Sequence, residues 1–114
     1  MRLAIGPLSL NGNDDWPLVG HETLGGMVVP FQPGEPIPDA DAVLHWSPEY
    51  NVLDTSGFRG LVCCFLGDWH INIPDLSRYA LIATDRRGVR EVGKGDPRFI
   101  YWRGFSFDPR LHFC

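Results

Sequence analysis

The clearest pattern in the chain is an apolar run followed by strict alternation. Residues Leu61 to Leu66 form an uncharged apolar run with a glycine at each side, and the alternation continues at Trp69, Ile71 and Ile73. A short apolar run between turn residues is typical of a strand buried on both faces, and alternation is typical of a strand with one face in solvent. We therefore predict two paired strands at the centre of a small β-rich domain.

Other short segments predict further strands around this pair. Their ranges are residues 2–10, 25–31, 42–46, 50–54, 79–84 and 98–107, with a return strand from Val89 that would close a hairpin through the turn at 85–88. The best place for a single helical turn is 74–78. Short strands at this spacing predict a mainly β fold, a small sandwich or barrel of about seven to nine strands with little helix.

The composition agrees with many short strands joined by turns. The 114 residues include 13 glycines and 10 prolines, about a fifth of the chain against a usual share of about 12%. Both residues weaken helix interiors and mark turns. No shift in composition marks a boundary, so we predict one β-rich domain over residues 1–114.

The chain shows no export or membrane signal. The apolar stretch near its start is interrupted by Gly6-Pro7, and no segment approaches the ~20 apolar residues that span a bilayer. Cys63 and Cys64 would point to opposite faces of a strand, so with Cys114 we interpret them as small hydrophobic residues in a reducing compartment. We expect a cytoplasmic protein that makes no contact with membranes.

The charges divide unevenly along the chain. Residues 1–57 hold one base and eight acids, a net charge of −7, whereas residues 58–114 hold nine bases and six acids, a net charge of +3. Most of the acids fall in predicted loops, where they would attract a basic protein and repel nucleic acid. The alternative interpretation is that they only keep a small domain in solution.

Aromatic residues beside these acids favour an interface, because aromatic side chains often anchor binding surfaces. The residues that we predict to contact a partner are Asp14, Asp15, Trp16, Glu35, Asp39, Asp41, Trp46, Glu49 and Tyr50. The hypothesis is an inhibitor or immunity-type protein. It would cover a basic surface such as the active site of a nuclease or a nucleic-acid-modifying toxin.

The second half of the chain offers an alternative, because its arginines interleave with aromatic residues between Arg86 and Arg110. Such a surface can bind single-stranded nucleic acid by stacking and phosphate contact. A sequence pI near 5.4 and the lack of a nucleic-acid-binding motif argue against it.

Catalytic motifs are absent from the sequence, so we predict no catalytic residue and no cofactor. No serine lies in a nucleophile elbow and no glycine-rich loop matches a phosphate-binding fingerprint. Asp68 and His70 would share one strand face and, with His45, are weak candidates for metal ligands. Nothing in the sequence brings them together.

Two further function classes stay open. One is a small barrel enzyme or ligand-binding domain whose pocket is lined by Trp69, His70, Tyr101 and Trp102. The other is an assembly subunit of a larger complex. The partner and the oligomeric state are not indicated by the sequence.

Overall fold

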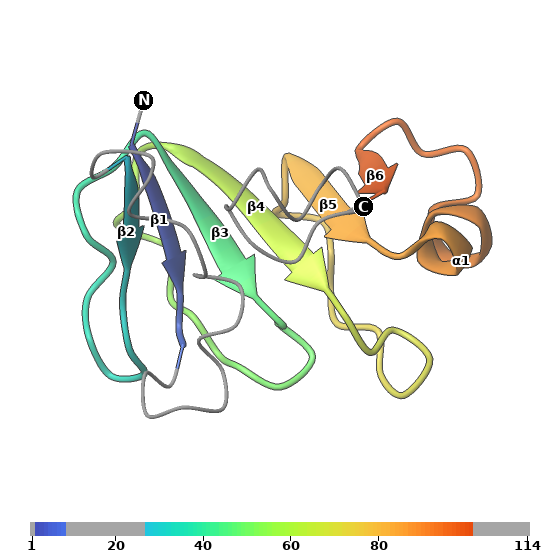
Figure 1. Ribbon diagram of the computed structural model, residues 1–114, viewed down its shortest axis with the longest axis horizontal. Helices are drawn as coiled ribbons and strands as arrows, with labels where there is room; N and C mark the ends of the chain where they lie inside the picture. The colour runs from blue at the N-terminus through green and yellow to red at the C-terminus, as the bar shows by residue number, and fades with distance from the viewer. Residues whose placement is uncertain (1, 9–26, 102–114) are drawn as a thin grey trace, which may run out of the picture.

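A computed structural model describes residues 2–8 and 27–101, and these residues form one parallel sheet (Figure 1). Its six strands run in the order β2-β1-β3-β4-β5-β6, and every neighbouring pair is parallel. The strands are β1 Leu3–Gly6, β2 Val28–Pro30, β3 Ala42–Trp46, β4 Leu61–Leu66, β5 Leu81–Thr84 and β6 Phe99–Tyr101. One helical segment follows β5, as α1 Arg86–Gly88 continued by a π-helix over Val89–Gly93.

The prediction of a mainly β chain is confirmed, but the sandwich or barrel of about seven to nine strands is wrong. The described residues hold a single layer of six parallel strands instead. Short apolar runs fit both architectures, because strands in a parallel sheet are buried on both faces just as a sandwich core strand is. Many of the described glycines and prolines, such as Gly34, Pro36 and Gly57, belong to crossovers that return the chain to the start of the next strand.

The predicted strand at Ala42–Trp46 and the apolar run at Leu61–Leu66 are confirmed as β3 and β4. The alternating stretch after β4 is a loop instead, and Ile71 and Ile73 are 66% and 53% exposed in it. The segment at 50–54 is also a loop. The apolar residues at these positions alternate with polar ones, but the segments pair with no strand and their apolar side chains are not packed on one face.

The predicted hairpin after β5 is wrong, because the chain turns into a helix there. The side chain of Asp85 accepts a hydrogen bond from Gly88 N at 2.6 Å and so caps the helix N-terminus. The helical turn predicted at 74–78 is a turn at Ser77 and Arg78 without helix.

The described crossovers pack on one face of the sheet. Val43 on β3 contributes to an apolar cluster with Ile37 and Phe58, which come from the crossovers before and after β3. Ile82 on β5 contributes to a second cluster with Tyr79. A parallel sheet needs both faces covered. In other parallel-sheet proteins helices cover the faces, whereas on this face loops provide most of the cover.

Residues of the opposite face make a separate cluster. Ile5 and Leu44 lie side by side in neighbouring strands, and Trp46 stacks on Phe65 with ring centroids 4.3 Å apart. Cys63 packs against this cluster while Cys64 is buried in the other face, as the alternation of strand side chains requires.

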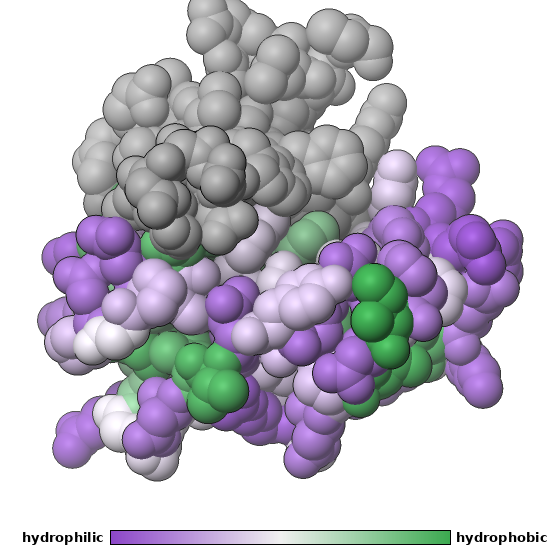
Figure 2. Space-filling view, turned by 90° about the horizontal axis from the view of Figure 1, so that it is seen from below, coloured by the Kyte–Doolittle hydropathy of each residue, from purple (hydrophilic) through white to green (hydrophobic). Residues whose placement is uncertain are grey.

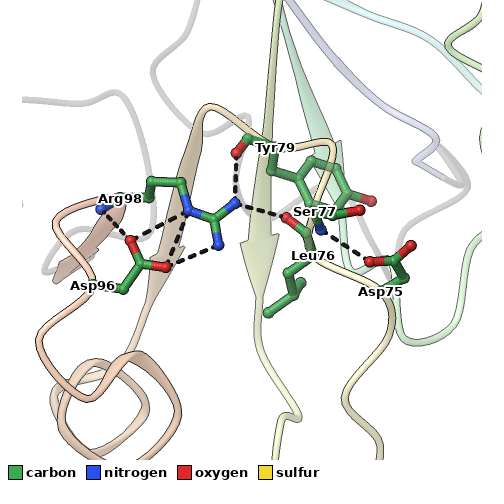
Figure 3. Close-up of polar contacts among 6 residues, drawn as sticks. All are labelled: Asp75, Leu76, Ser77, Tyr79, Asp96 and Arg98. Atoms are coloured by element: carbon green, nitrogen blue, oxygen red, sulfur yellow. Dashed lines mark hydrogen bonds and ion pairs between the residues drawn. The ribbon is translucent and has the colours of Figure 1, made fainter.

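Side-chain hydrogen bonds connect crossovers that contain little helix (Figure 3). The guanidinium of Arg98 donates to both carboxylate oxygens of Asp96, with the shortest bond at 2.8 Å. The same side chain donates to the backbone carbonyls of Leu76 and Tyr79 at 3.0 and 3.1 Å. These bonds join the chain before β6 to the crossover before β5. Arg98 also holds the pKa of Asp96 below its ordinary value.

Within the part of the chain that the structure describes, no helix has the length and apolar character that crossing a membrane requires.

Candidate functional site

The strand order marks one place on the sheet as special. The chain leaves β1 for β2 on one side and leaves β3 for β4 on the other, so the connections diverge between β1 and β3. In open parallel sheets, ligands bind outside the carboxyl ends of the strands at such a switch point. The arrows of β1, β3, β4 and β5 point downward in Figure 1, and Figure 2 views the molecule from below, where hydrophobic patches stand among hydrophilic side chains on the part not drawn in grey.

The turn that follows β3 has an unusual backbone. Ser47 has a φ of +53°, the left-handed region that non-glycine residues rarely adopt and that often marks functional segments. The side-chain amide of Asn51 stabilises the turn by donating to the carbonyls of Trp46 and Ser47 at 2.8 and 3.3 Å. The backbone N–H groups of Tyr50 and Asn51 also donate to the Ser47 carbonyl.

His45 on β3 holds this turn in place by a hydrogen bond to its backbone. Its Nε2 lies 2.7 Å from the Asn51 carbonyl, which can only accept, so Nε2 carries the proton. Nδ1 then accepts from the Tyr79 hydroxyl at 2.8 Å and from Arg78 Nη2 at 3.2 Å.

The surroundings of His45 keep its ring neutral. Burial lowers the pKa of His45 to about 4, the hydrogen bond to Asn51 opposes this, and the nearby Arg78 charge adds to it. A protonated ring would turn an N–H toward the arginine, so the neutral tautomer is the one that this network accommodates. His45 therefore acts as a positioning residue for the turn.

Glu49 lies in this turn, at the carboxyl end of β3. It is only 9% exposed, and its Oε2 accepts a hydrogen bond from Asp68 N at 3.1 Å. Its Oε1 is buried and has no hydrogen-bond partner among the described residues. Burial raises the pKa of Glu49, and the Ser47 side chain lies near enough to lower it in part without satisfying Oε1.

The loop after β4 packs beside this turn. The hydroxyl of Tyr50 donates to Asp68 Oδ2 at 2.6 Å, and Asn72 Nδ2 lies 3.5 Å from the Glu49 carbonyl. Two carboxyl groups, from Glu49 and Asp68, thus lie near one another at the ends of β3 and β4, with the exposed ring of Tyr50 beside them.

Arginines occupy the next part of the edge. Trp69 Nε1 donates to Asp85 Oδ1 at 3.0 Å, and the guanidinium of Arg87 lies 5.6 Å from the centre of the Trp69 ring. Arg86 lies in the same way 5.0 Å from the Tyr101 ring. The edge is therefore acidic at β3 and β4, whereas the segment after β5 carries arginines together with acids, since Arg87 also pairs with Glu91 at 3.2 Å.

The structure separates the residues that were predicted to contact a partner. Glu35 and Asp39 are exposed on the crossover before β3, and Asp41 is exposed with Oδ2 accepting from Arg2 N at 2.7 Å. Trp46 is buried in the core and Glu49 is buried at the edge, whereas Tyr50 is 59% exposed. Asp14, Asp15 and Trp16 lie outside the described residues. The basic protein partner stays a prediction.

The weak metal candidates do not converge. His45 binds Asn51 and Tyr79, Asp68 binds Tyr50, and His70 is exposed with its ring edge-on to Trp69. Across residues 2–8 and 27–101, no group of three histidine, cysteine, aspartate or glutamate side chains could hold a metal ion. His112 and Cys114 lie outside these ranges, as does Trp102 of the predicted pocket. The rings of Trp69 and Tyr101 each carry an arginine instead of facing one another.

Asn51 and Asp85 were missed by sequence reasoning, and Arg86 and Arg87 were considered only for a nucleic-acid surface. The available signal was position, because polar residues directly follow the apolar runs that end at Trp46, Leu66 and Thr84. That signal becomes useful only once the strands are known to be parallel, since parallel strands bring their carboxyl ends to one edge.

Comparison with known proteins adds no relative, because no family model, curated protein or solved structure matches the chain.

Proposed function

We propose that the protein binds a small polar ligand at the carboxyl edge of its sheet, with Glu49 as the central contact. The observation that carries the proposal is Glu49 Oε1, a buried oxygen without a hydrogen-bond partner among the described residues, in the turn after β3 and beside the loop after β4. An unmatched buried polar group costs about 1–3 kcal/mol. A ligand donor that displaced the atoms covering this oxygen would remove this cost.

The second carboxyl group and the turn support the same site. Asp68 lies beside Glu49 and offers further acceptor capacity toward hydroxyl or amine groups. The left-handed conformation of Ser47, held by Asn51 and His45, supports the proposal because strain of this kind is kept where a precise geometry is needed.

The arginines suggest the other end of the ligand. Arg86 and Arg87 follow β5, which is two strands from β3, a separation of about 10 Å. A ligand of that length with hydroxyl groups at one end and an anionic group at the other would contact both parts of the edge. The proposed ligand class is therefore a hydroxyl-bearing small molecule with a negative charge.

The test uses three probes that separate the two ends, ribose 5-phosphate, ribose and inorganic phosphate. Binding is followed by tryptophan fluorescence and by the shift in melting temperature. We expect ribose 5-phosphate to bind more tightly than either fragment. Glu49→Gln should weaken ribose and ribose 5-phosphate, and Arg87→Gln should weaken phosphate and ribose 5-phosphate.

Arg59→Gln is the matched control, because Arg59 is an exposed arginine near the start of β4, away from the carboxyl edge. It should leave all three affinities unchanged. Binding that Glu49→Gln does not alter, or no saturable binding by any of the probes, would contradict the proposal.

We also propose that the protein works in the cytoplasm. Cys63 and Cys64 are free thiols, as is usual where glutathione and thioredoxin keep cysteines reduced. Fractionation of the native cells, with detection of the chain in the soluble cytoplasmic fraction, would test this.

A further inference from the structure

A hollow of about 620 Å³ opens between two crossovers, away from the carboxyl-edge site. One wall comes from the crossover between β2 and β3, and the other from the crossover between β3 and β4. Its described lining residues are Gly34, Glu35, Pro36, Ile37, Leu53, Asp54, Ser56, Gly57 and Phe58. None of them belongs to the ligand site proposed above.

The floor of the hollow is apolar. Ile37, Leu53 and Phe58 are half-buried and form the outer layer of the cluster around Val43. One side of each of these side chains packs against the cluster, and the other side is exposed. Such surface gains free energy when an apolar part of a partner covers it.

The carboxylates of Glu35 and Asp54 line the walls of the hollow, and each is held by a hydrogen bond. Glu35 Oε1 accepts from Gln32 N at 2.6 Å, and Asp54 Oδ1 accepts from Ser56 N at 3.0 Å. Each bond holds its carboxylate on the wall of its own crossover. The hydrogen bonds from Ser56 also lower the pKa of Asp54, so this group is ionised at neutral pH.

The basic residues nearby do not line the hollow. Residues 31–58 contain no lysine or arginine. Arg59 is exposed and is not among the described lining residues. Arg78 donates to the Leu53 carbonyl and to Thr55 Oγ1, and it lines the neighbouring cavity of about 330 Å³ together with His45. The positive charge of Arg78 helps to lower the pKa of Asp54, but no lysine or arginine is among the described residues that line the hollow, so a partner's cation would be the first base to enter it.

We infer that this hollow is the docking site for a basic partner protein, and that it receives an arginine or lysine flanked by apolar residues. The apolar stem of such a side chain would cover Ile37, Leu53 and Phe58, and its charged head would meet Glu35 and Asp54. The inference gives the predicted basic partner a defined position. It is independent of the small-molecule site, since the two share no residue.

The test is an NMR titration of the ¹⁵N-labelled protein with three short peptides, acetyl-Leu-Arg-Leu-amide and its versions with glutamine or glutamate at the centre. The arginine peptide should shift the amide signals of Gly34, Leu53 and Gly57 in a saturable way. The glutamine peptide should bind more weakly and the glutamate peptide should not bind. Glu35→Gln and Asp54→Asn should each weaken the arginine peptide by up to about fivefold, as is usual for exposed ion pairs.

Asp39→Asn is the matched control, because Asp39 is an exposed acid on the same crossover that does not line the hollow. Gly57→Lys gives a second test. A Cβ at Gly57 meets no atom within 4 Å, so the lysine can be accommodated and should abolish binding, while Gly57→Ala should not. The inference is overturned by equal binding of the arginine and glutamine peptides, or by an equal effect of Asp39→Asn and Asp54→Asn.

Discussion

The buried histidine on β3 should make the stability of the protein depend on pH in a defined direction. His45 is only 1% exposed, and its pKa falls from an ordinary value of 6.5 to about 4 in the folded chain. Between these values the unfolded chain binds a proton at this position and the folded chain does not. The free energy of unfolding should therefore fall as the pH falls from 6.5 toward 4.

The size of this effect follows from the two pKa values. The difference between 6.5 and about 4, at about 1.4 kcal/mol for each pKa unit, corresponds to about 3 kcal/mol of unfolding free energy. The contribution is complete above the pKa of the unfolded chain and is lost once the pH reaches the folded value. Three kilocalories is a large part of the stability of a domain of this size, which is about 5–15 kcal/mol.

Two variants isolate the contribution of the ring. His45→Asn keeps an acceptor near Tyr79 and Arg78, and His45→Gln keeps a donor near the Asn51 carbonyl, yet neither side chain titrates. Urea unfolding at pH values from about 7 to about 4, followed by tryptophan fluorescence, gives the free energy of each protein. The wild type should lose about 3 kcal/mol more than either variant over this range, since all other groups titrate alike in the three proteins.

A constant difference between wild type and both variants across this pH range would refute the reasoning. A measurement on the wild type alone covers the case in which the variants do not fold. The NMR signal of the His45 ring should stay at its neutral position down to a pH near 4, and a midpoint close to 6.5 would show that the ring is not held neutral.

Three further predictions concern the edge, the helix and the thiols. Burial raises the pKa of Glu49, so ionisation destabilises the fold as the pH rises. Glu49→Gln should therefore unfold at a higher urea concentration than the wild type at neutral pH, and an equal or lower midpoint would contradict this. A Cβ at Gly88 would lie 2.5 Å from Thr84 Oγ1 and 3.0 Å from Trp69 Cδ1. Gly88→Ala should thus cost about 1–3 kcal/mol in urea unfolding, whereas Gly57→Ala should cost far less. Burial raises the pKa of Cys64 to about 12, so this thiol should react with a disulfide reagent at mildly alkaline pH only after unfolding, which mass spectrometry of the labelled peptide would check.

The sequence indicates the buried strands well because each is a short uncharged run. β3 and β4 were placed at their observed bounds from this pattern alone. The direction of the strands could not be predicted, since hydrophobic periodicity does not distinguish a parallel from an antiparallel neighbour. The usual sign of a parallel sheet is a helix between strands, and the described crossovers here hold only one helical segment.

Some residues of the candidate site were predicted from the sequence, but for a different function. The sequence predicts Glu49 and Tyr50 as contacts for a basic partner, whereas the structure places them in the turn after β3, beside Asp68 of the loop after β4. His45 was weighed as a metal ligand, but its two nitrogens bind Asn51 and Tyr79. Apart from the contact of His45 with Asn51, these pairings join residues at least 18 apart in the chain, and a single sequence carries no local signal for such contacts.

The pairing of β1 has a consequence for how the chain assembles during synthesis. Leu3 pairs with Val28 on one side and with Ala42 on the other, so β1 leaves the ribosome before both of its neighbours and waits for them. Each later strand also joins its neighbour only after a whole crossover has been made. Contacts of this long range slow folding, because the entropy of closing each loop is lost before the contacts form. The nascent chain should therefore expose the apolar face of β1 for longer than a helical domain of equal length would, and its yield should depend on chaperones that shield such segments.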